Sequence, residues 1–139
     1  MPDPRESLRR LTAASAAGDL DSLCHDYGVE LLVAFGSAVR EGTQPRNLDI
    51  AVLFRRDLPK PDVLGFLDAL GVLADTTAID LMDLGRAGPV ARERALVGGL
   101  TLAELTPGTF ARERMHAITE RMDTDWLRRL DLELMARGR

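Results

Sequence analysis

The chain has 139 residues, of which 45% are hydrophobic and 29% are charged. This length and composition are typical of one globular domain with a single core, and they exclude wholesale disorder. The formal net charge of -4 supplies no overall positive field, which excludes duplex nucleic acid as the main partner. No apolar run reaches the roughly 20 residues that span a bilayer, and the N-terminus lacks the apolar segment of a signal peptide. We therefore expect a cytoplasmic protein without a membrane segment.

Two short helices are predicted at the N-terminus. Pro4 suits a first helical turn, and the apolar residues after it keep helical spacing as far as Gly18. Asp19 is expected to cap the second helix, which Gly28 ends. Cys24 lies among the apolar positions of that helix, so we expect a buried structural thiol.

Two strands are predicted next. Val29 to Phe35 is a nearly unbroken apolar run, short enough to be a buried strand that the Gly36-Ser37 pair terminates. The segment from Asn47 to Phe54 is predicted to be a strand whose residues Leu48, Ile50, Val52 and Phe54 face one side of a sheet, while Ala51 faces the other. Asn47 and Asp49 then face the other side.

Four more elements follow at short intervals. Pro59 and Pro61 precede a third helix, whose apolar residues recur at helical spacing. The apolar residues expected on one face of this helix are Val63, Phe66, Leu67, Leu70 and Leu73. The remaining elements are a strand at Thr77 to Leu84, a helix from Pro89 to the Gly98-Gly99 pair, and a strand at Leu100 to Leu105.

The C-terminal segment is predicted to be a long helix. Residues 109 to 137 contain neither proline nor glycine, and the apolar residues keep helical spacing. A continuous helix would be about 45 Å long, longer than a small domain is wide, so it either breaks near Asp123-Thr124-Asp125 or projects. Its apolar stripe includes Trp126, Leu127, Leu130, Leu132 and Leu134. A partner protein, a second copy of the chain in a homo-oligomer, or the sheet itself is expected to cover that stripe.

Together these elements predict an α/β (α+β) fold with a mixed sheet of about four strands flanked by helices. Residues 1–106 are expected to form the main domain. Residues 107–139 are expected to form a C-terminal helical tail that belongs to the same domain.

The residues around the first two strands are typical of phosphoryl transfer. Gly36 allows a backbone to approach phosphates closely, and a turn at Ser37 directs amide groups toward them. Acidic residues two positions apart on a strand share a face, and with an acid such as Asp80 from a neighbouring strand they hold magnesium. Asp83 points to the opposite face and is expected to cap the following turn.

On these residues the chain resembles the minimal nucleotidyltransferases (MNT) of the DNA polymerase beta superfamily. Gly36, Ser37 and Arg40 match the Gly-Ser-x-x-Arg start of the family motif, and Asp80 lies in a segment similar to its third-acid strand. Asn47-Leu48-Asp49 aligns with the Asp-x-Asp of the family, after a loop one residue shorter than is typical.

Asn47 is a departure from the motif because it replaces the first aspartate. Shifting the alignment so that Asp49 is the first acid places Ala51 at the second, so neither register restores the pair. An asparagine offers an amide oxygen but no negative charge to a hard cation, and we expect weaker metal binding and slower catalysis. A weakened enzyme and a catalytically inactive binder are both compatible with this residue.

The resemblance implies an antitoxin that neutralises a HEPN ribonuclease toxin by transferring AMP from ATP to a toxin tyrosine. Asp49 and Asp80 would bind Mg²⁺, Asp80 would help to deprotonate the tyrosine, and Asn47 would occupy the third catalytic position. Gly36 and Ser37 would bind phosphates. Arg40 would either steer a phosphate or brace the loop. The alternatives are an inactive antitoxin that acts by binding alone and a stand-alone transferase that modifies a small molecule.

Overall fold

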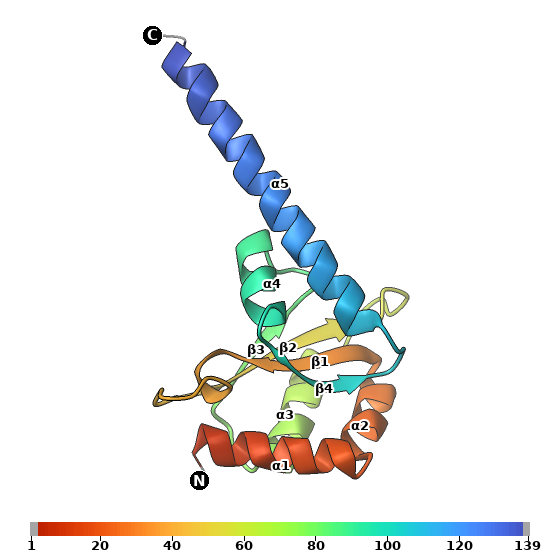
Figure 1. Ribbon diagram of the computed structural model, residues 1–139. Coiled ribbons are helices and arrows are strands. Elements are labelled where there is room, and N and C mark those ends of the chain that lie inside the picture. The colour runs from red at the N-terminus through yellow and green to blue at the C-terminus, as the bar shows by residue number, and fades with distance from the viewer. Residues whose placement is uncertain (1–2, 138–139) are drawn as a thin grey trace.

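The computed structural model describes residues 3–137 as a four-stranded sheet with helices on both faces (Figure 1). In chain order the elements are α1 (Pro4–Ala16), α2 (Asp19–Tyr27), β1 (Val29–Phe35), η1 (Gly36–Ala38), β2 (Leu48–Phe54), α3 (Val63–Ala74), β3 (Ile79–Asp83), α4 (Pro89–Leu96), β4 (Leu100–Glu104) and α5 (Thr109–Arg137). The predicted α+β class with a mixed sheet is confirmed.

The strand order is β3-β2-β1-β4. β1 pairs antiparallel with both β2 and β4, whereas β2 and β3 are parallel. Helices α1, α2 and α3 cover one face of the sheet, and α4 and the start of α5 cover the other (Figure 1). The alternation of β2 follows this arrangement, because Ile50 and Val52 pack in the first layer and Ala51 and Leu53 in the second.

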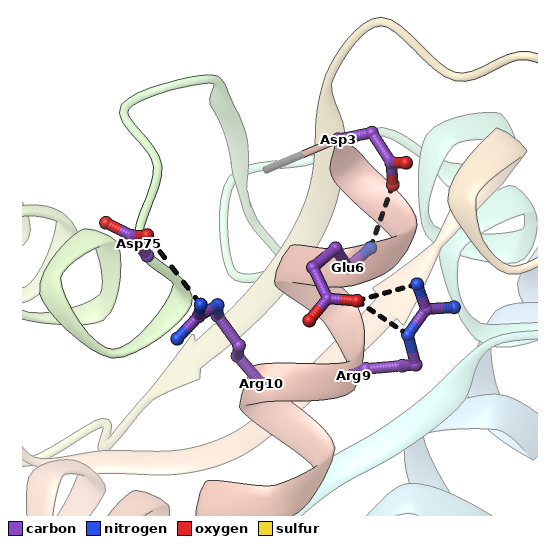
Figure 2. Close-up of polar contacts among 5 residues, drawn as sticks. All are labelled: Asp3, Glu6, Arg9, Arg10 and Asp75. Atoms are coloured by element: carbon purple, nitrogen blue, oxygen red, sulfur yellow. Dashed lines mark hydrogen bonds and ion pairs between the residues drawn. The ribbon is translucent and has the colours of Figure 1, made fainter. Parts of the chain in front are cut away.

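Helix α1 is held on the sheet by its buried residues Leu8 and Leu11, and its N-terminus is capped by Asp3. Asp3 accepts a hydrogen bond from the Glu6 backbone at 2.9 Å, and Pro4 occupies the first turn as predicted. Figure 2 shows this cap beside the Glu6–Arg9 ion pair and the 3.9 Å contact between Arg10 and Asp75. The last two contacts are exposed and contribute little stability.

Several local predictions can be compared with the structure. Cys24 is buried, as expected, and burial raises the pKa of its thiol to about 12, so the thiol is not a nucleophile at neutral pH. Asp19 does not cap α2, because Gly18, in a left-handed conformation, occupies the cap position. Val63 is exposed rather than part of the buried face of α3, since it lies at the first turn, beyond the edge of the core. Asn47 lies in a bend one residue before β2.

Helix α5 is continuous through Asp123 and Asp125, and its C-terminal half projects from the domain (Figure 1). It does not fold back over the sheet. Two ion pairs hold its first half against α4. Arg92 contacts Glu113 at 2.8 Å with both side chains mostly buried, and Arg121 lies 3.6 Å from Glu93.

The projecting helix carries an exposed apolar stripe, which we call the outer face of α5. At about 3.6 residues per turn, this stripe lies on the opposite side from Ala117 and Arg121, which face the domain. Trp126 is 63% exposed. The outer face comprises Met115, Met122, Trp126, Leu130 and Leu134. Among residues 3–137, none of the helices combines the length and apolar character needed to cross a bilayer.

Candidate nucleotide-binding site

The turn after β1 strongly favours glycine at position 36. Gly36 has a φ of +76°, a conformation that side chains with a Cβ rarely adopt. A Cβ atom there would also lie 2.4 Å from the Asp49 Oδ2 atom. The carboxylate of Asp49 is therefore packed directly against the Gly36-Ser37 turn.

Asp49 and Asp80 lie side by side on adjacent strands. They are register partners in the parallel β2–β3 pair, so both side chains project from the same face of the sheet. The Asn47 amide donates a hydrogen bond to the Asp80 carboxylate at 3.0 Å. The structure thus brings together the three residues that the sequence placed in the catalytic role.

The charge of Asp49 is shaped by its surroundings. Partial burial and the negative charge of Asp80 raise the pKa of the Asp49 carboxyl above its usual 3.8. The positive charges of Arg94 and Arg40 act in the opposite direction and partly offset this rise. A carboxylate pair of this kind favours a bound cation, because a cation relieves the repulsion between the two acids.

A cavity of about 510 Å³ opens beside the turn. Its volume falls within the range of small-molecule sites. The lining residues are Phe35, Gly36, Ser37, Arg40, Asp49, Glu93, Arg94, Val97 and Gly98. The predicted phosphate-binding residues Gly36, Ser37 and Arg40 thus share one wall with Asp49.

The segment after Ser37 is held by hydrogen bonds to its backbone. The Thr43 hydroxyl lies 2.6 Å from the Ser37 carbonyl oxygen and 3.0 Å from that of Arg40. Arg5 of α1 donates to the Arg40 carbonyl and to the Thr43 hydroxyl, both at 2.8 Å. The Arg40 backbone therefore takes part in bracing the loop, while Arg40 also lines the cavity.

Glu93 and Arg94, on α4, line the cavity but were not predicted from the sequence. The sequence places a helix after Pro89, yet it has no pattern that shows which side of this short helix faces the Gly36 turn. Asp83 caps the next turn as predicted, because its carboxylate accepts a hydrogen bond from the Gly85 backbone at 2.9 Å.

No protein-family model and no curated protein sequence matches the chain. Solved structures do match. A toxin-antitoxin structure with AMP-PNP aligns with a TM-score of 0.63 and 24% identity, over 84% of this chain and 95% of that chain. A chain from the structure of a tri-AMPylated HEPN toxin from Shewanella oneidensis in complex with an MNT antitoxin aligns with a TM-score of 0.61 and 19% identity. The alignment covers 91% of this chain and 98% of that chain. The toxin-antitoxin MntA-HepT structure aligns with a TM-score of 0.60 and 20% identity, over 86% of this chain and 95% of that chain.

The chain has the MNT fold. Its order of elements, mixed sheet and glycine turn agree with the nucleotidyltransferase-like architecture that the sequence predicted. The alignments extend over nearly the whole length of the matched chains.

In this MNT fold the carboxylates available for a metal are few. Within residues 3–137, no group of three or more His, Cys, Asp or Glu side chains is arranged to hold a metal ion. Asp49 and Asp80 form a pair, and the position next to Asp80 is taken by the uncharged Asn47. This donor set suits one hard cation better than two.

A second cavity, of about 380 Å³, lies between the end of α3 and the start of β3. Its lining includes the acids Asp68 and Asp75 and no basic residue. A phosphate would be repelled there. The cavity beside the Gly36 turn, whose lining includes Arg40 and Arg94, is therefore the better candidate for a phosphate-containing ligand.

The close approach at Gly36 leads to a stability prediction. Gly36→Ala should lower the free energy of unfolding by about 3 kcal/mol, because left-handed backbone strain of roughly 1–2 kcal/mol is joined by the clash with Asp49. Gly42→Ala is the matched control, since its φ is +73° and a Cβ there meets nothing within 4 Å. Urea unfolding measures both variants. Equal losses would contradict the proposed clash.

The raised pKa of Asp49 leads to a pH prediction. A folded-state pKa above the unfolded value means that ionisation of Asp49 reduces stability as pH rises through that range. Asp49→Asn should therefore raise the melting temperature at pH 7, and its advantage should shrink toward pH 3.5. Asp57→Asn is expected to have the opposite sign at pH 7, because its hydrogen bond with Arg55 lowers the pKa of Asp57. A lower melting temperature for Asp49→Asn at pH 7 would refute this account.

Proposed function

We propose that this chain is a cytoplasmic MNT-type antitoxin that binds ATP with Mg²⁺ and acts on a HEPN ribonuclease toxin. The observation that carries the proposal is the Asp49–Asp80 pair, packed against the left-handed glycine turn at Gly36. Support for the partner comes from the solved complexes of the same fold, one with AMP-PNP and one with a tri-AMPylated HEPN toxin.

Asp49 and Asp80 are the residues that would hold Mg²⁺. Carboxylate oxygens are the preferred ligands of this hard cation, and two adjacent carboxylates supply both oxygen and charge. Bound Mg²⁺ would neutralise negative charge on the phosphates of ATP. The Asn47 side chain must turn its amide oxygen toward the metal to contribute, which breaks its hydrogen bond to Asp80.

The proposed reaction is AMP transfer to a tyrosine of the toxin. The tyrosine oxygen attacks the α-phosphorus of ATP, a phosphorus–oxygen bond forms, and the bond to the bridging oxygen of the β-phosphate breaks. Pyrophosphate leaves, and the phenolic proton passes to Asp80. Gly36 and Ser37 hold the phosphates through the backbone of the turn, and Arg40 supplies positive charge from the same wall.

A second candidate is an antitoxin that neutralises the toxin by binding alone. Two observations favour it. Asn47 removes one negative charge from the catalytic cluster, and the outer face of α5 is an apolar surface suited to a protein partner. In both candidates this face packs against the toxin, which is helical in the family that the sequence resembles, in the helix-on-helix mode.

The role of Asn47 can be tested by restoring the acid. Asn47→Asp should tighten Mg²⁺-dependent ATP binding about tenfold, or about 1.4 kcal/mol, because the site gains a charged ligand. Without metal, the same variant should melt at a lower temperature than the wild type, since a third carboxylate then faces Asp80. Calorimetric titration and thermal unfolding, each with Mg²⁺ and with EDTA, measure both effects.

Asp49→Ala and Asp80→Ala are the controls for this experiment. Both should weaken ATP–Mg²⁺ binding while the protein remains folded. Unchanged ATP–Mg²⁺ affinity in both variants would contradict the metal-dependent site. An Asn47→Asp variant with the same ATP–Mg²⁺ affinity as the wild type would show that residue 47 is not a metal ligand.

The outer face of α5 can be tested with a HEPN toxin as the binding partner. Trp126→Ala combined with Leu130→Ala should weaken binding to that protein by at least tenfold, because buried aromatic and aliphatic anchors dominate interfaces. Leu132→Ala is the matched control, since Leu132 is also exposed but lies on another side of the helix. Equal binding by all three proteins would exclude the outer face as the contact surface.

The same variants distinguish the two candidates. Loss of toxin neutralisation in Asp49→Ala, with toxin binding intact, supports AMP transfer. Neutralisation that survives Asp49→Ala but fails in the Trp126 and Leu130 double variant supports binding alone. Mass spectrometry of the toxin, which detects added AMP, provides the independent measurement.

A further inference from the structure

Arg94 reaches the nucleotide cavity from a different element than the motif residues do. It lies near the end of α4 and lines the cavity opened by the Gly36-Ser37 turn. Its guanidinium carbon is 5.8 Å from the centre of the Phe35 ring. Phe35 is almost fully buried, so its ring is a fixed platform under a long side chain that is otherwise exposed.

The charges around this cavity leave Arg94 available for an anion. The charged residues of the lining are two cations, Arg40 and Arg94, and two acids, Asp49 and Glu93. Arg121 of α5 lies 3.6 Å from the Glu93 carboxylate and compensates its charge. Within the part of the chain that the structure describes, Arg94 has no carboxylate at ion-pair distance, although its charge acts on Asp49.

A nucleoside triphosphate needs more positive charge here than one metal ion supplies. Among residues 3–137, no third carboxylate joins Asp49 and Asp80, and Asn47 adds no charge. A guanidinium is permanently charged and presents parallel donors that match a pair of phosphate oxygens. It also needs no carboxylate to hold it in place.

We propose that Arg94 is a nucleotide-binding residue that holds the phosphate chain from the α4 side of the cavity and supplies charge that a second metal ion would otherwise provide. This inference rests on the proposed function, because the ligand is the same ATP. It adds that nucleotide binding by this chain depends on metal only in part. ATP still binds when Mg²⁺ is removed, and the affinity that remains without metal depends on Arg94.

The test is a calorimetric titration of the full chain with ATP in Mg²⁺ and in EDTA. Arg94→Met keeps the apolar stem over Phe35 and removes the charge. It should weaken binding at least tenfold in Mg²⁺ and abolish measurable binding in EDTA. Arg94→Lys keeps the charge but loses the parallel donors of the guanidinium. Its affinity for ATP should lie between those of Arg94→Met and the wild type. Arg114→Met, which removes an exposed arginine of α5 remote from the lining, should bind like the wild type.

Inorganic tripolyphosphate is the second probe, because it has the phosphate chain without the nucleoside. The same loss in Arg94→Met with this probe supports a phosphate contact. Equal affinity of the wild type and Arg94→Met for ATP overturns the assignment and leaves the proposed function standing. If neither the wild type nor Arg94→Met binds ATP, both the assignment of Arg94 and the proposed function are overturned. Unchanged melting of Arg94→Met would show that the loss is not due to unfolding.

Discussion

The parallel pairing of β2 with β3 is the constraint on which the candidate site depends. It places Asp49 directly beside Asp80, and a slip of one residue would turn every β3 side chain to the opposite face. The same position of Asp49 dictates glycine at residue 36, because the turn passes against its carboxylate. The β2–β3 register therefore determines the acid pair, and the antiparallel β1–β2 register, in which Phe35 pairs with Asp49, places that pair against the glycine turn.

The electrostatics of the cavity follow from this arrangement. Asp49 and Asp80 repel each other, and partial burial adds to the cost of ionising Asp49. Arg40 and Arg94 reduce that cost but come from different elements, one after η1 and one on α4. Asn47 donates a hydrogen bond to Asp80 where a third acid would add repulsion. The cluster is thus easier to fold without metal than a cluster of three carboxylates would be, and weaker at attracting metal.

Much of the fold could be predicted from local patterns. The bounds of β1 were predicted correctly because the apolar run and the glycine after it are unambiguous. The start of β2 was one residue early, since the alternation continues into the bend at Asn47. The motif residues Gly36, Asp49 and Asp80 were brought together as expected. Arg94 could not be foreseen, because its placement depends on how α4 packs on the sheet, which no spacing within eight residues determines. Whether α5 bends or projects was equally open, since its apolar residues have helical spacing in either case.

Helix α4 lies between the cavity beside the Gly36 turn and the projecting helix α5. One of its sides carries Arg94 into the cavity, while Arg92 and Glu93 hold α5 through Glu113 and Arg121. A ligand that shifts α4 would therefore act on the ion pairs that hold the base of α5. Thermodynamic linkage requires such an effect to be reciprocal: if occupancy of the cavity changes the affinity of the outer face for its partner, the partner changes the affinity for nucleotide by the same factor. The ion pairs along α4 are the contacts whose change would supply that coupling free energy.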